Sequence, residues 1–139
     1  MTKRLYTLAA LLLGATALTV AQSGRTIEVA IFYTGSGTVD AGHKIYVALW
    51  NSPNLDSVPV DVQPLASKTG TVTFKNVQTA PAYVSTAYDP TGKWDAQSAP
   101  PSGSSLGMYG IPPKPDPVNV EPGKTTKIKL TFADANKVP

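Results

Sequence analysis

The chain has 139 residues, 12 Lys and Arg against 9 Asp and Glu, a formal net charge of +3, no cysteine and one histidine. This length fits one compact domain with a real core, and two domains would not fit. Because cysteine is absent and His43 is the lone histidine, we exclude disulfides and a transition-metal enzyme, and we expect no metal site and no cofactor.

The N-terminal segment has the order of a secretory signal peptide. Lys3 and Arg4 precede an apolar run over residues 5–18, and the sequence Thr19-Val20-Ala21 then resembles a cleavage site, with Ala21 as its small last residue. The run is too short to span a bilayer comfortably, so we expect cleavage after Ala21 rather than a retained anchor. Residues 1–21 are therefore the predicted signal peptide and 22–139 the predicted domain, without an integral membrane segment. We expect an exported protein of the periplasm, the cell surface or the extracellular space.

Loss of Lys3 and Arg4 with the leader would lower the net charge from +3 to +1. Binding to nucleic-acid phosphates needs clustered, excess Lys and Arg. We therefore expect no nucleic-acid partner.

The mature chain opens with two runs of alternating apolar residues. Residues 26–33 predict a strand with Ile27 to Tyr33 at alternate positions on one face. A glycine-rich turn over 35–42 follows. Residues 44–50 predict the next strand, with Ile45, Val47 and Leu49 inward and Tyr46, Ala48 and Trp50 on the opposite face.

Three further strands are predicted before residue 89. The piece over 58–62 is assigned to a sheet edge, because Pro59 and the following Pro64 cannot donate ladder hydrogen bonds. Residues 71–77 alternate with Val72 and Phe74 inward. Residues 82–88 are apolar on both faces and predict a central strand.

Residues 89–117 carry many prolines and small residues and are interpreted as a long loop, which is usually functional or mobile. Short strands are then predicted over 118–120 and 126–132. About seven strands without an amphipathic helix predict an all-β fold, a single antiparallel β-sandwich of the immunoglobulin-like or transthyretin-like kind.

The stretch from Lys44 to Phe132 resembles bacterial carboxypeptidase-regulatory-like domains, also called transthyretin-like or prealbumin-like. The matching features are Ile45-Tyr46-Val47-Ala48-Leu49, Phe74-Lys75-Asn76-Val77 before Ala82-Tyr83-Val84, Leu106-Gly107-Met108-Tyr109-Gly110, Val118-Asn119-Val120 and Gly123. The resemblance implies a β-sandwich of an exported structural family rather than an activity.

One departure from that family has chemical meaning. Many such domains carry an acidic, calcium-like turn after the central strand, whereas this chain reads Asp89-Pro90-Thr91-Gly92-Lys93. Lys93 brings positive charge to a place where calcium needs an oxygen ligand. We therefore expect an Asp-Pro turn capped by the Asp89 side chain and no calcium site.

Candidate catalytic groups are few. Ser105 lies in a formal Gly-x-Ser-x-Gly motif, but the lone His43 precedes it and no predicted helix follows. Asp89 and Asp95 share one loop, which leaves open a small extracytoplasmic hydrolase in which one of them is strongly desolvated. We expect no catalytic residue and no enzyme activity.

The aromatic side chains are the main candidates for binding. Trp50 lies on the minority face of its strand, Tyr88 ends the central strand, and Trp94 and Tyr109 fall in the 89–117 loop. They predict a shared exposed surface that stacks on sugar or anchors a protein. In the alternative, Trp94 and Tyr109 fold back over the core. We expect a non-enzymatic binding or structural accessory domain of the cell envelope, with an envelope protein or a polysaccharide as partner.

Overall fold

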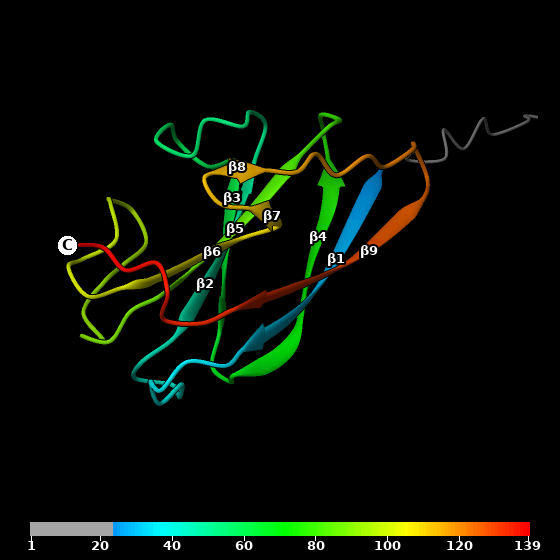
Figure 1. The fold of residues 1–139 in the computed structure, drawn as a ribbon. Coiled ribbons are helices and arrows are strands. Elements are labelled where there is room, and N and C mark those ends of the chain that lie inside the picture. Colours follow the sequence, from blue (N-terminus) through cyan, green and yellow to red (C-terminus); the bar gives the residue numbers. More distant parts are fainter. Residues whose placement is uncertain (1–23) are drawn as a thin grey trace, which may run out of the picture.

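The computed structural model describes residues 24–139, and the regular structure in that range is all β-strand (Figure 1). The predicted signal peptide, residues 1–21, lies outside the described residues. No helix within that range is long and apolar enough to cross a membrane. The strands are β1 (Arg25–Tyr33), β2 (Ile45–Trp50), β3 (Asp61–Leu65), β4 (Thr69–Val77), β5 (Tyr83–Tyr88), β6 (Ser105–Met108), β7 (Gly110–Ile111), β8 (Lys114–Pro115) and β9 (Thr125–Phe132).

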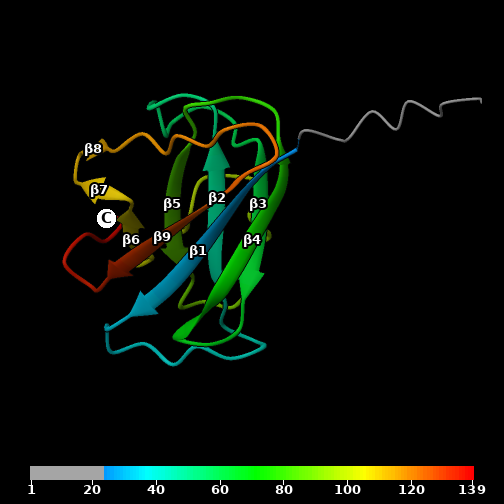
Figure 2. The same cartoon turned by 90° about the vertical axis from the view of Figure 1, so that its right-hand side faces the viewer.

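These strands form two larger sheets and one small hairpin. One sheet has the order β4-β1-β9, the second has the order β3-β2-β5-β6, and β7 pairs with β8. Figure 2 shows the three-stranded sheet in front of the four-stranded one. The position of β3 confirms the predicted edge strand, but the strand covers 61–65 rather than 58–62, so Pro64 lies within it and Pro59 precedes it. β5 lies between β2 and β6 as the predicted central strand.

The first and last strands pair in parallel. β1 and β9 run side by side from Thr26 opposite Thr125 to Tyr33 opposite Phe132. The prediction of a wholly antiparallel arrangement is therefore wrong for this pair. Parallel neighbours need a connection that returns the chain to the same end of the sheet. The whole of the chain between β1 and β9 supplies that connection here.

The inner faces of both larger sheets share one apolar core. Alternation places every second side chain of a strand on that face. The inward residues predicted for residues 26–33, 44–50, 71–77 and 126–132 are confirmed. The buried side chains from these strands are Ile27, Val29, Ile31, Tyr33, Ile45, Val47, Leu49, Val72, Phe74, Val77, Ile128, Leu130 and Phe132.

The segment 89–117 is not the single loop that was predicted. It contains β6, which pairs with β5, and the short β7 and β8. Gly107 lies in β6 where a Cβ atom would collide with Phe132, so this strand needs a glycine that breaks the apolar pattern. The strand predicted over 118–120 is also wrong, because Val118 makes only an isolated bridge to Ala82.

The two outer sheet faces differ in chemistry. The outer face of β4-β1-β9 carries Glu28, Lys75, Lys127 and Lys129 at the positions that alternate with the buried ones. Figure 1 shows the segments after β2 and after β5 projecting on the far side of the four-stranded sheet, away from β4, β1 and β9. The outward positions of β2 and β5 on that far side hold Tyr46, Trp50 and Tyr83.

Candidate functional site

The candidate site is the outer face of the four-stranded sheet, called here the aromatic face. Its side chains stand at the positions that alternate with the buried ones, and the strand register places them in neighbouring rows. No Asp, Glu, Lys, Arg or His is among them. The aromatic face consists of Val62, Pro64, Tyr46, Ala48, Trp50, Tyr83, Ser85, Ala87, Leu106 and Met108.

Trp94 lies against this face from the segment that follows β5. Its ring meets the ring of Tyr46 edge to face, with centroids 5.0 Å apart and an interplanar angle of 81°. The Tyr46 hydroxyl donates a hydrogen bond to the carbonyl oxygen of Trp94 at 3.1 Å. The indole Nε1 of Trp94 donates to the carbonyl oxygen of Ser98 at 3.1 Å. These contacts fix a half-buried ring whose polar groups are already paired.

Asp89 determines where Trp94 lies. Oδ1 of Asp89 accepts hydrogen bonds from the backbone N–H of Thr91 at 2.8 Å and from its hydroxyl at 2.7 Å. Oδ2 accepts from the backbone N–H of Trp94 at 2.9 Å. This is the capped Asp-Pro turn that the sequence predicts. The carboxylate holds the next five residues in one conformation.

The same contacts bear on the chemistry of Asp89. Burial by itself raises the pKa of Asp89, but hydrogen bonds from Thr91 and Trp94 stabilise the carboxylate more, so its pKa lies below the ordinary value. A general acid or base needs a pKa near the working pH. Asp95 is exposed and accepts a hydrogen bond from the backbone N–H of Gln97 at 2.9 Å. Asp89 therefore lacks the raised pKa that a hydrolase would require of it, and the exposed Asp95 lacks the desolvated setting.

Trp50 also belongs to the aromatic face, but it is 8% exposed. Its Nε1 donates to the Ser85 hydroxyl at 2.9 Å, so the indole reaches across onto the neighbouring strand β5. The prediction that Trp50 is openly exposed is therefore wrong. The assignment of Trp50 to the outer face is right, because Leu49 and Val47 of the same strand point inward.

Tyr88 and Tyr109 point to the other side of the sheet. Tyr88 is 5% exposed, its ring packs 5.1 Å from that of Tyr33, and its hydroxyl donates to the carbonyl oxygen of Thr38 at 2.7 Å. Tyr109 is partly buried against the core. The predicted surface shared by all four aromatic residues is thus wrong for these two, and Tyr109 follows the alternative in which it covers the core.

Sequence reasoning missed Tyr46 and Tyr83 as site residues. Both are partly exposed, and Tyr83 stands directly opposite Trp50 in the β2-β5 register. Tyr46 was assigned to the outward face of its strand, and that alternation was the available signal. The contact with Trp94, 48 residues away along the chain, had no signal in the sequence.

Ser105 and His43 have separate structural partners. Ser105 is 1% exposed, and its hydroxyl donates to Asp134 Oδ1 at 2.7 Å. His43 Nδ1 lies 3.0 Å from Asp40 Oδ1 in a partly exposed turn. The formal nucleophile motif around Ser105 is therefore a buried strand start, not an exposed elbow. Across residues 24–139, no three His, Asp or Glu side chains gather closely enough to hold a metal ion.

A partly buried polar cluster around Asp134 was also missed. Asp134 Oδ1 accepts from the hydroxyls of Tyr33 at 2.5 Å and Ser105 at 2.7 Å. Its Oδ2 accepts from the backbone N–H and the hydroxyl of Ser36, at 2.9 and 3.1 Å. Hydrogen bonds from Tyr33, Ser36 and Ser105 hold the pKa of Asp134 well below its ordinary value. The cluster ties the turn after β1 to the segment after β9.

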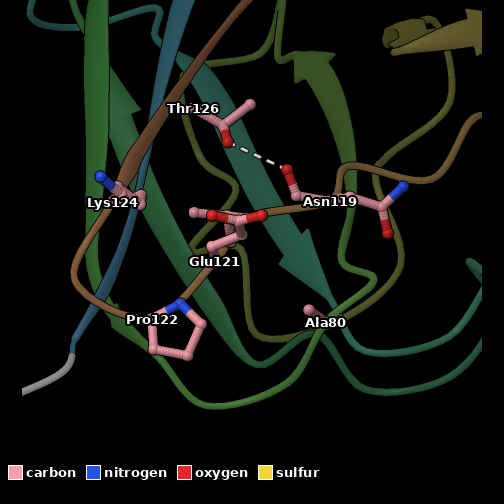
Figure 3. A pocket seen from close by; sticks show the side chains of 7 residues that line it. Ala80, Asn119, Glu121, Pro122, Lys124 and Thr126 are labelled. Atoms are coloured by element: carbon pink, nitrogen blue, oxygen red, sulfur yellow. Dashed lines mark hydrogen bonds between the residues drawn. The ribbon is translucent and has the colours of Figure 1, made fainter.

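A shallow pocket of about 530 Å³ lies beside the turn before β9, and none of its lining residues belongs to the aromatic face or to the Asp134 cluster. Figure 3 shows its side chains spread around the rim, with one hydrogen bond drawn, from the Thr126 hydroxyl to the Asn119 carbonyl oxygen at 2.9 Å. Glu121 and Lys124 are both exposed. The pocket therefore offers no group of convergent, buried polar atoms of the kind that orients a ligand.

Comparison with known proteins adds no relative, since no family model, no curated protein and no solved structure matches the chain.

Proposed function

We propose that the protein is an exported, non-enzymatic binding or structural accessory domain of the cell envelope. Its partner is an envelope protein or a polysaccharide, engaged through the aromatic face together with Trp94. The two facing sheets are proposed to form one β-sandwich of the immunoglobulin-like or transthyretin-like kind, in agreement with the resemblance to carboxypeptidase-regulatory-like domains. Residues 1–21 are proposed to direct export and to be removed.

One observation carries this proposal. Trp94 is held over the outer side of the sheet by Asp89 and Tyr46, on a face whose strands present no charged side chain. Tryptophan and tyrosine bury a large area at small entropic cost and dominate interaction surfaces. A ring that is fixed before binding loses little further freedom when a partner covers it.

A hydrolase centred on Asp89 or Asp95 is disfavoured by the paired Asp89 carboxylate. The test is a pH-rate profile on candidate substrates with the wild type and Asp89→Asn. Activity that is abolished by Asp89→Asn and retained in Trp94→Ala would contradict the binding proposal.

The binding proposal is tested by retention of material from the cell-envelope fraction of the producing organism on immobilised protein. Trp94→Ala is the test variant. Lys127→Ala, whose side chain is 79% exposed on the opposite sheet, is the matched control. We expect Trp94→Ala to lose the retained material and Lys127→Ala to keep it, with similar melting temperatures for both.

Two outcomes would contradict the proposal. One is equal retention by the wild type and Trp94→Ala. The other is a loss of several kcal/mol of stability in Trp94→Ala, about the 3–5 kcal/mol found for fully buried aromatic side chains, which would make Trp94 a core residue.

A further inference from the structure

We propose that the aromatic face binds a neutral polysaccharide, with the sugar chain lying along β2 and β5 between the Tyr46–Trp94 pair and Tyr83. This inference rests on the proposed binding function and names the class of partner. It follows from the spacing of the aromatic rows, from the small residues between them and from the distribution of charge.

The aromatic side chains occupy two places along the same strands. Tyr46 and Trp94 mark the first, and Trp50 with Tyr83 directly opposite it marks the second. Tyr46 and Trp50 are four residues apart in one strand, which corresponds to about 13 Å at roughly 3.3 Å per residue. Such a separation exceeds one sugar ring and suits an extended chain of linked rings.

The row between these two places has small side chains. Ala48 stands opposite Ser85 in the β2-β5 register, and both are partly exposed. Ala48 therefore forms a low place on β2 between Tyr46 and Trp50, and on β5 the Trp50 indole lies against Ser85 beside it. Sugar rings present polarised C–H groups on one face, which are attracted to the negative face of an aromatic ring. The hydroxyl of the partly exposed Tyr83 can pair with the sugar hydroxyls.

The polar groups of the fixed rings are already satisfied within the protein. Tyr46 donates to Trp94, Trp94 Nε1 to Ser98, and Trp50 Nε1 to Ser85. The partly exposed rings of Tyr46 and Trp94 are thus left for contact, whereas Trp50 is 8% exposed and supports the face from below. These side chains are held in place before a ligand arrives. This arrangement favours stacking on a flat ligand at low entropic cost.

Charge selects a neutral chain over an acidic one. The ten residues of the aromatic face contain no charged side chain, and the exposed Lys93 and Asp95 beside Trp94 carry opposite charges. On the outer face of the other sheet, by contrast, Lys75, Lys127 and Lys129 outnumber Glu28. An acidic polymer would bind preferentially to that basic face, with affinity falling as salt rises. A neutral chain gains nothing there and would bind the aromatic face at any ionic strength.

The test is affinity electrophoresis of the purified protein in native gels that contain hydroxyethyl cellulose, soluble starch or galactomannan, with polygalacturonate as the acidic comparison. We expect at least one neutral polymer to slow the wild type equally at low and high salt. Trp94→Ala and Tyr83→Ala should each weaken that binding by about tenfold or more, and Lys127→Ala should leave it unchanged. A blue shift of tryptophan emission on adding the same polymer tests the wild type without a variant.

Three results would overturn the inference: no neutral polymer slows the wild type, the acidic polymer binds better and is released by salt, or both aromatic variants bind a neutral polymer as the wild type does. Failure of this inference is distinguishable from failure of the proposed function. Envelope material that depends on Trp94 but is destroyed by protease would keep the binding function and assign it to a protein partner. No retained envelope material and no polymer binding would reject both.

Discussion

Asp134 offers the sharpest test of how the fold is held together. Its carboxylate accepts four hydrogen bonds, from Tyr33, from Ser105 and twice from Ser36. Tyr33 is 3% exposed and Ser105 is 1% exposed, whereas Asp134 is only partly buried and Ser36 is exposed, so water can reach part of the site if the carboxylate is removed. An orphaned buried donor costs about 1–3 kcal/mol. Asp134→Ala removes the acceptor of both buried hydroxyls, and since water can reach part of the site, it should lower the free energy of unfolding by about 1–3 kcal/mol in total.

The dependence on pH gives a second readout. The folded pKa of Asp134 lies below its unfolded value of about 3.9, because the hydrogen bonds favour the carboxylate. The folded state therefore binds fewer protons at this group, and the stabilisation is complete above about pH 5. It declines as the pH falls below about 4 and disappears below the folded pKa.

The assay is urea unfolding of the wild type, Asp134→Asn and Asp134→Ala at pH 7 and at pH 3. We expect the Asn variant, which keeps the shape but not the charge, to be less stable than the wild type at pH 7. The gap between them should narrow at pH 3. Equal stabilities at pH 7, or a gap that stays constant down to pH 3, would refute the assignment of Asp134 as an ionised acceptor.

Three other substitutions test the packing and the turn. Asp89→Ala should cost about 1–3 kcal/mol in urea unfolding because three donors lose their acceptor, and an unchanged midpoint would show that the turn is held by other contacts. Gly107→Ala should cost about 1–3 kcal/mol in thermal unfolding, because the added methyl group forces Phe132 aside. An unchanged melting temperature would show that the two strands are further apart than described. Phe74→Ala should cost about 3–5 kcal/mol of unfolding free energy. Val58→Ala, at a residue 85% exposed, should change it by no more than about 0.5 kcal/mol. Similar costs for the two variants would contradict the assignment of Phe74 to the core.

The strands that the sequence predicts well are those with regular alternation. β1 and β9 were found because Ile27, Val29, Leu130 and their neighbours repeat at every second position. β6 was missed because its inward positions are Ser105 and Gly107, which carry no apolar signal. Their small size is set by contacts with other strands, and such contacts cannot be read from a local window.

The site shows the same division. The outward direction of Trp50 follows from the alternation of β2. Its burial could not be predicted in this way, because the indole is buried by reaching onto Ser85 of another strand. The inward direction of Tyr88 could have been derived from the alternation with Val84 and Thr86 in β5. The Asp134 cluster joins residues about a hundred positions apart, which leaves no local pattern.

Trp94 differs from these residues because local chemistry determines its position. Asp89 directly follows β5, and its backbone N–H donates to the Lys44 carbonyl oxygen at 3.2 Å, so the turn starts at a fixed point of the sheet. The Asp89 carboxylate then binds the N–H groups of Thr91 and Trp94 within five residues. The short capped turn thus fixes the position of the Trp94 indole relative to β5, although Trp94 itself lies outside the strands. Any loss of the Asp89 cap should therefore weaken the proposed polysaccharide binding at the aromatic face, as measured by affinity electrophoresis, even where the core remains folded.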